Sequence, residues 1–224
     1  MTTKTRKLKT KPRTKDKPFD LKEACVQAAR EVIADRGVEG LSMRDVARKL
    51  SISHQAPYRH FESRDHLLAE IMSRCFADFA EHLDNRDGVP DLDQDLRAMG
   101  CEYLAYAASK PLEYRLMFGT PWPEPAKHPE LVKYAVHAFN ILRHTLRSKH
   151  GDIPENYARA DLDAMFIWST LHGMASITQA NVMAHLALAP EVLGNFQPYL
   201  MQKMGFGLAA TIELIAISTK KNIA

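Results

Sequence analysis

Apolar residues recur at intervals of three and four positions through most of the chain, which is the spacing that one face of an α-helix requires. No segment shows the strict alternation of apolar and polar residues that is typical of a half-buried strand. We therefore expect an all-α fold. The expected helices cover residues 21–36, 43–50, 54–61, 64–83, 92–109, 111–118, 129–149, 157–186 and 190–219.

The second and third of these helices are short and are separated by only three residues. Ser42 is a good N-cap for the first of them, and Asp45 places negative charge near the positive end of its dipole. Ser53 is expected to cap the next helix, in which Pro57 costs one backbone hydrogen bond. Two short helices with a tight connection, preceded by a third helix, predict a helix-turn-helix DNA-binding domain.

Side chains at the start of the second short helix have the chemistry that reads base edges in the major groove. Gln55 can pair with adenine, and the Ala56 methyl group can pack on a thymine methyl group. Tyr58 and Arg59 lie one turn later and are better placed to grip phosphates, although Tyr58 could instead anchor the small helical core. The residues expected to contact DNA are Ser42, Arg44, Ser53, His54, Gln55, Ala56, Tyr58, Arg59, His60 and Arg64.

The segment Gly37–Ala47, followed by Leu50–Ser53 and Tyr58–Phe61, resembles the DNA-binding domain of the tetracycline-repressor (TetR) family. This resemblance covers roughly residues 20–70. It implies a three-helix N-terminal domain, a variable helical ligand-binding domain and a homodimer. The sequence departs from the family pattern at Ser51, where glycine is more usual, and at Pro57, where leucine is common.

The net charge of +3 is unevenly distributed, because residues 1–18 alone carry eight basic side chains and one acidic one. The remainder of the chain is therefore mildly acidic, at −4. So dense a charge block is expected to be a flexible arm. It could follow the DNA backbone or the minor groove, serve only as a solubilising tail, or, less favourably, bind a membrane surface.

Aromatic and methionine residues are concentrated between residues 76 and 172, and such a composition suits an adaptable apolar cavity. His137 and His172 are candidates for its few polar groups. Ordinary helical core is the alternative for any single member, and the family resemblance is what favours a cavity. The expected ligand-binding residues are Phe79, Met99, Tyr103, Tyr106, Met117, Phe118, Trp122, Phe139, Phe166 and His172.

The last two helices carry small or apolar residues at helical spacing. One stripe contains Ser169, Gly173, Ser176 and Ala180, and the other contains Leu200, Met204, Gly207, Thr211, Leu214 and Ser218. Small residues let helices approach closely, so these faces could form a four-helix dimer interface or pack within one subunit. The family resemblance favours the dimer.

Catalytic and metal-binding motifs are not evident. The sequence has no glycine-rich phosphate loop, nucleophile elbow or HExxH pair, so we expect neither an enzyme nor a cofactor nor a metal. Cys25, Cys75 and Cys101 are too widely spaced for a paired-cysteine site, and Cys25 is expected in the core. With no apolar run after the basic arm to form a secretory signal, a reducing cytoplasm fits best.

Together these patterns predict a flexible arm over residues 1–18, a helix-turn-helix domain over 19–65 and a ligand-binding and dimerisation domain over 66–224, with the helix at 64–83 connecting the last two. The predicted function is a cytoplasmic, homodimeric repressor that a small apolar or aromatic molecule releases from a palindromic DNA operator. The alternative is an architectural protein that binds DNA without sequence preference through the arm. Activation instead of repression stays open, and the sequence does not identify the effector, the operator or the regulated genes.

Overall fold

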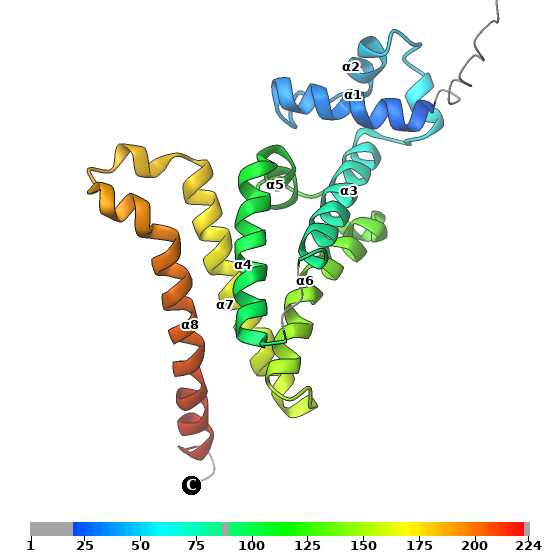
Figure 1. Cartoon of the computed structure of the whole chain (residues 1–224). Coiled ribbons are helices and arrows are strands. Elements are labelled where there is room, and N and C mark those ends of the chain that lie inside the picture. The colour runs from blue at the N-terminus through cyan, green and yellow to red at the C-terminus, as the bar shows by residue number, and fades with distance from the viewer. Residues whose placement is uncertain (1–19, 87–89, 222–224) are drawn as a thin grey trace, which may run out of the picture. The chain divides into compact units, whose positions relative to one another are not determined.

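A computed structural model describes residues 20–86 and 90–221, and the side chains of residue 206 and residues 209–221 lie outside the description. The described residues form helices and no strand, so the all-α prediction is confirmed (Figure 1). The chain forms two compact units, one ending at Glu62 and the other beginning at Ser63. None of the helices in the described part is long and apolar enough to cross a membrane. The basic arm lies outside the described residues.

The first unit is a three-helix domain made of α1 (Leu21–Arg36), α2 (Met43–Lys49) and η1 (Ala56–Arg59). Asp20 and Ser42 cap the two α-helices, because their side-chain oxygens accept hydrogen bonds from backbone amides three residues later, and the cap at Ser42 was predicted. The three elements pack on one another around a small apolar core. Its fully buried members include Cys25, Ile33 and Val46.

The prediction of an α-helix over residues 54–61 was wrong, because that segment is a single 3₁₀ turn over Ala56–Arg59. No side chain caps this turn, so the predicted cap at Ser53 was also wrong. Pro57 is the physical reason: it has no backbone N–H, and its buried ring occupies the first turn. The preceding connection passes through Ser51, whose φ of 56° lies in the left-handed region.

The second unit contains the remaining helices (Figure 1). They are α3 (Arg64–Asp84), α4 (Leu92–Ser109), α5 (Pro111–Phe118), η2 (Pro125–Lys127), α6 (Pro129–Lys149), α7 (Pro154–Gln179), η3 (Val182–His185) and α8 (Pro190–Lys221). α3 packs most extensively against α6, and α4 lies against α3, α5, α6 and α7. Ser63 caps α3 by accepting a hydrogen bond from the amide of His66 at 3.3 Å.

Two polar clusters fix α3 against α4. The Arg86 guanidinium donates two hydrogen bonds to the Asp95 carboxylate, at 2.9 and 2.8 Å, and a third to the Leu83 carbonyl. Further along, the Tyr106 hydroxyl donates to the Asp78 carboxylate at 2.8 Å, which also pairs with Lys110. Both clusters join residues that are distant in sequence, so they set the position of α4 on α3.

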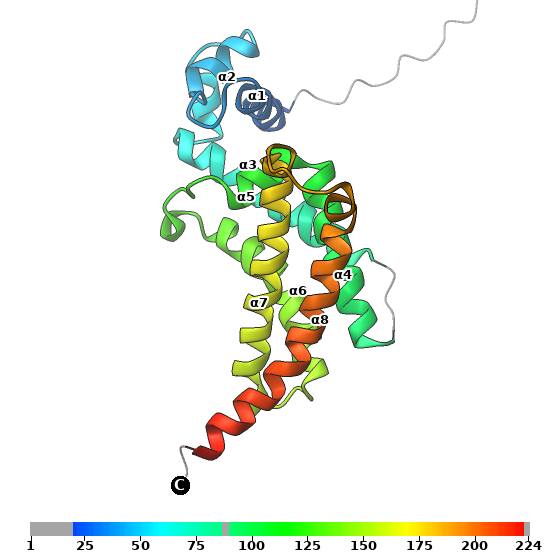
Figure 2. The same cartoon turned by 90° about the vertical axis from the view of Figure 1, so that its left-hand side faces the viewer.

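The helix predicted over residues 157–186 is shorter than expected, because α7 ends at Gln179. Asn181 has a φ of 52°, a left-handed conformation that an α-helix cannot continue through, and a separate 3₁₀ turn follows. α8 then runs back along α7 (Figure 2).

One face of α7 is open in the single chain. Leu162 and Phe166 are exposed on it by 62% and 43%, and the backbone of Gly173 has nothing within 4 Å of the position of a β-carbon. On α8, the side chains of the predicted stripe members Thr211, Leu214 and Ser218 lie outside the described residues. An uncovered apolar helix face indicates a partner surface.

Candidate nucleic-acid interface and ligand cavity

The turn around η1 presents a run of exposed polar side chains. His54, Gln55, Arg59 and His60 are all exposed, and Tyr58 is exposed by 46% although it is a large aromatic residue. The Gln55 amide lies 3.1 Å from the His54 ring nitrogen, so these two side chains form one hydrogen-bonding group. The small core below them is supplied by Pro57 and Phe61 rather than by Tyr58. Tyr58 is therefore free to contact a ligand such as DNA.

α2 is held rigid beside this turn by its first residues. The Ser42 hydroxyl hydrogen bonds to both the backbone amide and the carboxylate of Asp45. The Ser42 hydrogen bond, assisted by the nearby Arg36 guanidinium, lowers the pKa of the Asp45 carboxyl, while partial desolvation opposes that effect. Arg48 also pairs with this carboxylate. Ser42 thus has a structural role as a cap, and its contact with DNA stays a prediction.

Free positive charge near the turn comes from two arginines. Arg44 and Arg59 are exposed, and within the described ranges neither forms an ion pair, so both can meet phosphates. By contrast, Lys49 pairs with Glu31 at 2.9 Å, and this contact raises the pKa of the lysine. Arg64 is the first residue of α3 in the second unit, where its guanidinium lies 3.2 Å from Asp65.

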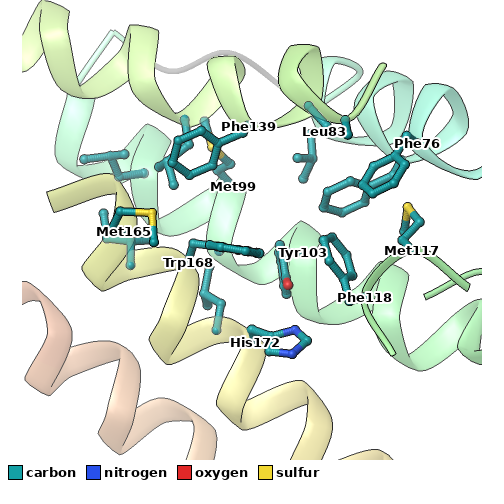
Figure 3. A pocket seen from close by; sticks show the side chains of 18 of the residues that line it. Phe76, Leu83, Met99, Tyr103, Met117, Phe118, Phe139, Met165, Trp168 and His172 are labelled. Carbon is teal, nitrogen blue, oxygen red and sulfur yellow. The ribbon is translucent and has the colours of Figure 1, made fainter. Parts of the chain in front are cut away.

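The second unit contains an apolar cavity of about 520 Å³ between α3, α4, α5, α6 and α7. This volume is within the range of small-molecule sites in proteins. Eight of the expected ligand-binding residues line it: Phe79, Met99, Tyr103, Met117, Phe118, Trp122, Phe139 and His172 (Figure 3). Several of the aromatic rings meet edge to face, as Phe79 and Tyr103 do with centroids 5.4 Å apart. Their roles in binding stay predictions.

Three expected cavity residues lie elsewhere, and these expectations were wrong. The Tyr106 side chain points at α3, where its hydroxyl binds Asp78 and the Cys75 carbonyl. Phe166 lies on the outer side of α7, near Gly207 of α8. His137 is exposed on α6, 3.9 Å from Asp84. Each helix offers several apolar faces, and composition does not say which one turns inward.

A chain of hydrogen bonds crosses one end of the cavity. The Tyr103 hydroxyl lies 2.8 Å from that of Tyr114, which in turn lies 2.7 Å from Nδ1 of His172. Nε2 of His172 is 3.4 Å from the Ser176 hydroxyl. Burial raises the pKa of Tyr114 to about 12 and that of Tyr103 further still, and it lowers the pKa of His172. All these groups are therefore uncharged at neutral pH.

Sequence reasoning did not find Tyr114, because its partner lies 58 residues away on another helix. The neighbouring Trp122 was expected, and its indole N–H donates to the Met117 carbonyl at 2.9 Å. This bond fixes the Pro121–Pro125 loop beside the cavity, so the loop contributes to the wall.

A second cavity of similar size lies between α4, α6, α7 and α8, and its wall is charged. It contains Asp93, Arg97, Lys149 and the buried pair of His150 and Asp163, whose Nε2 and Oδ2 atoms are 2.8 Å apart. Across residues 20–86 and 90–221, no three acidic, histidine or cysteine side chains gather in a way that could hold a metal ion.

The exposed polar turn on a three-helix unit and the apolar cavity in a second helical unit define a class, the helix-turn-helix transcription regulators with a second, helical domain. Comparison with known proteins supports this class. Residues 26–71 match the family model "Bacterial regulatory proteins, tetR family", and residues 96–195 match "Tetracyclin repressor-like, C-terminal domain". The chain belongs to the TetR family, whose members are DNA-binding transcription regulators and not enzymes.

Individual relatives support the same assignment. The chain is 33% identical to the HTH-type transcriptional regulator Mb1846 of Mycobacterium bovis over 101 residues, which is 44% of this chain and 43% of that regulator. The matched segment thus spans less than half of this relative. Among solved structures, a Rhodococcus sp. RHA1 protein of unknown function has a TM-score of 0.65 at 23% identity, covering 84% of this chain and 97% of its own. A TetR-like regulator from the same organism has a TM-score of 0.59 at 19% identity, covering 86% and 98%. These two structures support the fold.

Proposed function

We propose that the chain is a homodimeric repressor that binds a palindromic operator and leaves it when a small apolar or aromatic molecule enters the cavity. The single observation that carries this proposal is the cavity of about 520 Å³, because α3 supplies part of its wall and begins where the first unit ends. A ligand that favours one position of α3 would change the separation of the two η1 turns in a dimer. Only a ligand with different affinities for the two positions can do so. The site of action is the cytoplasm, where the bacterial chromosome lies.

DNA reading is assigned to the exposed turn at residues 54–60. Gln55 and Tyr58 supply base and backbone contacts, and the exposed Arg44 and Arg59 add phosphate contacts. Two copies related by two-fold symmetry would present two such turns to two half-sites.

The experiment is selection of operator fragments with the full chain, followed by binding measurements at several salt concentrations. Gln55→Ala and Tyr58→Ala should each abolish the preference for the selected sequence. Gln27→Ala is the control, because Gln27 is also exposed in the first unit but lies on α1. If sequence preference survives both replacements, the assigned reading residues are wrong. Uniform binding that disappears on deleting residues 1–18 would instead support an architectural DNA-binding protein.

Dimerisation is assigned to the open face of α7 together with α8. Leu162→Glu places a charge in this face and should give a monomer in analytical ultracentrifugation. Val136→Glu is the matched control, since Val136 is 49% exposed on α6, away from this face. A dimer that tolerates the Leu162 replacement would place the interface elsewhere.

A further inference from the structure

The wall of the apolar cavity carries no formal charge. No Asp, Glu, Lys or Arg side chain is among the residues that line it in the described part of the chain, and its polar groups gather at one end. In Figure 3 the Tyr103 hydroxyl points toward His172 at that end, while Phe139, Met99 and Leu83 surround the other. The cavity therefore has an apolar body and one polar terminus.

Charge in the ligand would be costly in such a site. An ion that leaves water needs an opposite charge or several hydrogen bonds to replace its hydration, and the wall offers neither. His172 does not become that opposite charge easily, because its burial favours the neutral ring. The charged side chains line the second cavity instead. Leu96 and Ile167 line both cavities.

The polar terminus has hydrogen-bonding capacity left for a ligand at the Tyr103 hydroxyl. The Tyr103 hydroxyl lies 2.8 Å from the Tyr114 hydroxyl, and a hydroxyl has one donor and two acceptor positions. A neutral imidazole has one donor and one acceptor nitrogen, so the chain through Tyr114 to His172 can run in either direction. In one direction Tyr103 is left with its O–H to donate, and in the other it is left with a lone pair to accept.

From this geometry we infer that the cavity takes an uncharged, largely apolar molecule that carries one carbonyl or hydroxyl group, bound at the Tyr103 hydroxyl. The inference rests on the proposed function for its biological meaning and deepens it by naming the ligand class. Because the chain can reverse, a ketone and an alcohol are both accommodated, whereas a carboxylate and an ammonium ion are excluded.

The test uses the intrinsic fluorescence of the full-length protein, because both tryptophans of the sequence, Trp122 and Trp168, line this cavity and neither lines the charged one. The probes are two matched sets: 2-nonanone, 1-nonanol, nonanoate and nonylamine, and 4-phenyl-2-butanone, 4-phenylbutanoate and 4-phenylbutylamine. In at least one set, at a pH of about 7.5, the uncharged members should bind at least about tenfold more tightly than the ions. Ions that bind within about threefold of the neutral members in both sets, or neutral members that give no saturable change in either, would overturn the inference.

Tyr103→Phe removes the hydroxyl while keeping the ring and should weaken ketone binding by about three- to tenfold. Tyr134→Phe is the control, because Tyr134 lies on α6 but does not line the cavity. Equal ketone affinity in both variants would show that the Tyr103 hydroxyl does not bind the ligand. DNA release is measured separately. A charged probe that enters the cavity and releases DNA would overturn the ligand class and leave the repressor proposal standing. A neutral probe that binds in the cavity without changing operator affinity would overturn the repressor proposal and leave the ligand class standing.

Discussion

Replacing Asp95 with alanine should destabilise the second unit far more than replacing its neighbour Asp93. The Asp95 carboxylate receives two hydrogen bonds from Arg86, and the two side chains are only 10% and 12% exposed. Removing one partner of a buried ion pair leaves the other charge unmatched and costs about 3 kcal/mol. Asp93 pairs with Lys149 but is 74% exposed, so its replacement should cost less than about 1 kcal/mol. Both residues lie in the first turn of α4, so both replacements lose the same interaction with the helix dipole.

The assay is urea-induced unfolding followed by circular dichroism, at one fixed protomer concentration because a dimer's stability depends on concentration. The double replacement Arg86→Ala with Asp95→Ala should cost less than the sum of the single ones, which isolates the pair. Equal unfolding midpoints for the Asp93 and Asp95 variants, with unchanged dependence on urea, would refute the reasoning. Leu83 and Leu96 lie beside this pair and line the cavity, so ligand affinity should fall together with stability.

Three further predictions concern single side chains. Ser42→Ala should lower the free energy of unfolding by about 1 kcal/mol through loss of the α2 cap, and an unchanged unfolding curve would show that the cap is not needed. Arg59→Ala should reduce the slope of log affinity against log salt by about 1, whereas the exposed Arg97 of α4 should have no effect when replaced in the same way. Because burial lowers the pKa of His172, the unfolded chain binds protons more readily below a pH of about 6.5, so stability should fall as the pH decreases through that range. His172→Gln should flatten this dependence in unfolding curves measured at a series of pH values, and an unaltered slope would assign the effect to other groups.

Local features of the fold could be predicted because they depend on neighbouring residues in the sequence. Ser42 was recognised as a cap from its position before an apolar periodic segment, and it accepts the expected backbone hydrogen bond. The 3₁₀ turn at η1 was not predicted. Pro57 was noticed, but its effect on the whole segment depends on how its ring is buried against the rest of the unit.

Features that join distant residues were harder to predict. Met165, Phe166, Ile167 and Trp168 are consecutive and apolar, so α7 has no single hydrophobic face that periodicity could identify. Phe166 turned out to lie outside the cavity, while its neighbours Met165, Ile167 and Trp168 line it. The bond from Tyr114 to His172 depends on the packing of two helices, which no local pattern records.

α3 is a single unbroken helix of 21 residues, and this continuity has a mechanical consequence. Phe76, which lines the cavity, is twelve residues beyond Arg64, a separation of about 18 Å along the axis. A tilt of about 5° about Phe76 would therefore move the first turn of α3 by about 1.6 Å. This displacement is larger than the whole range of donor–acceptor distances over which a hydrogen bond persists. A change in the cavity that is too small to alter any helix could thus make or break contacts at the N-terminal end of α3.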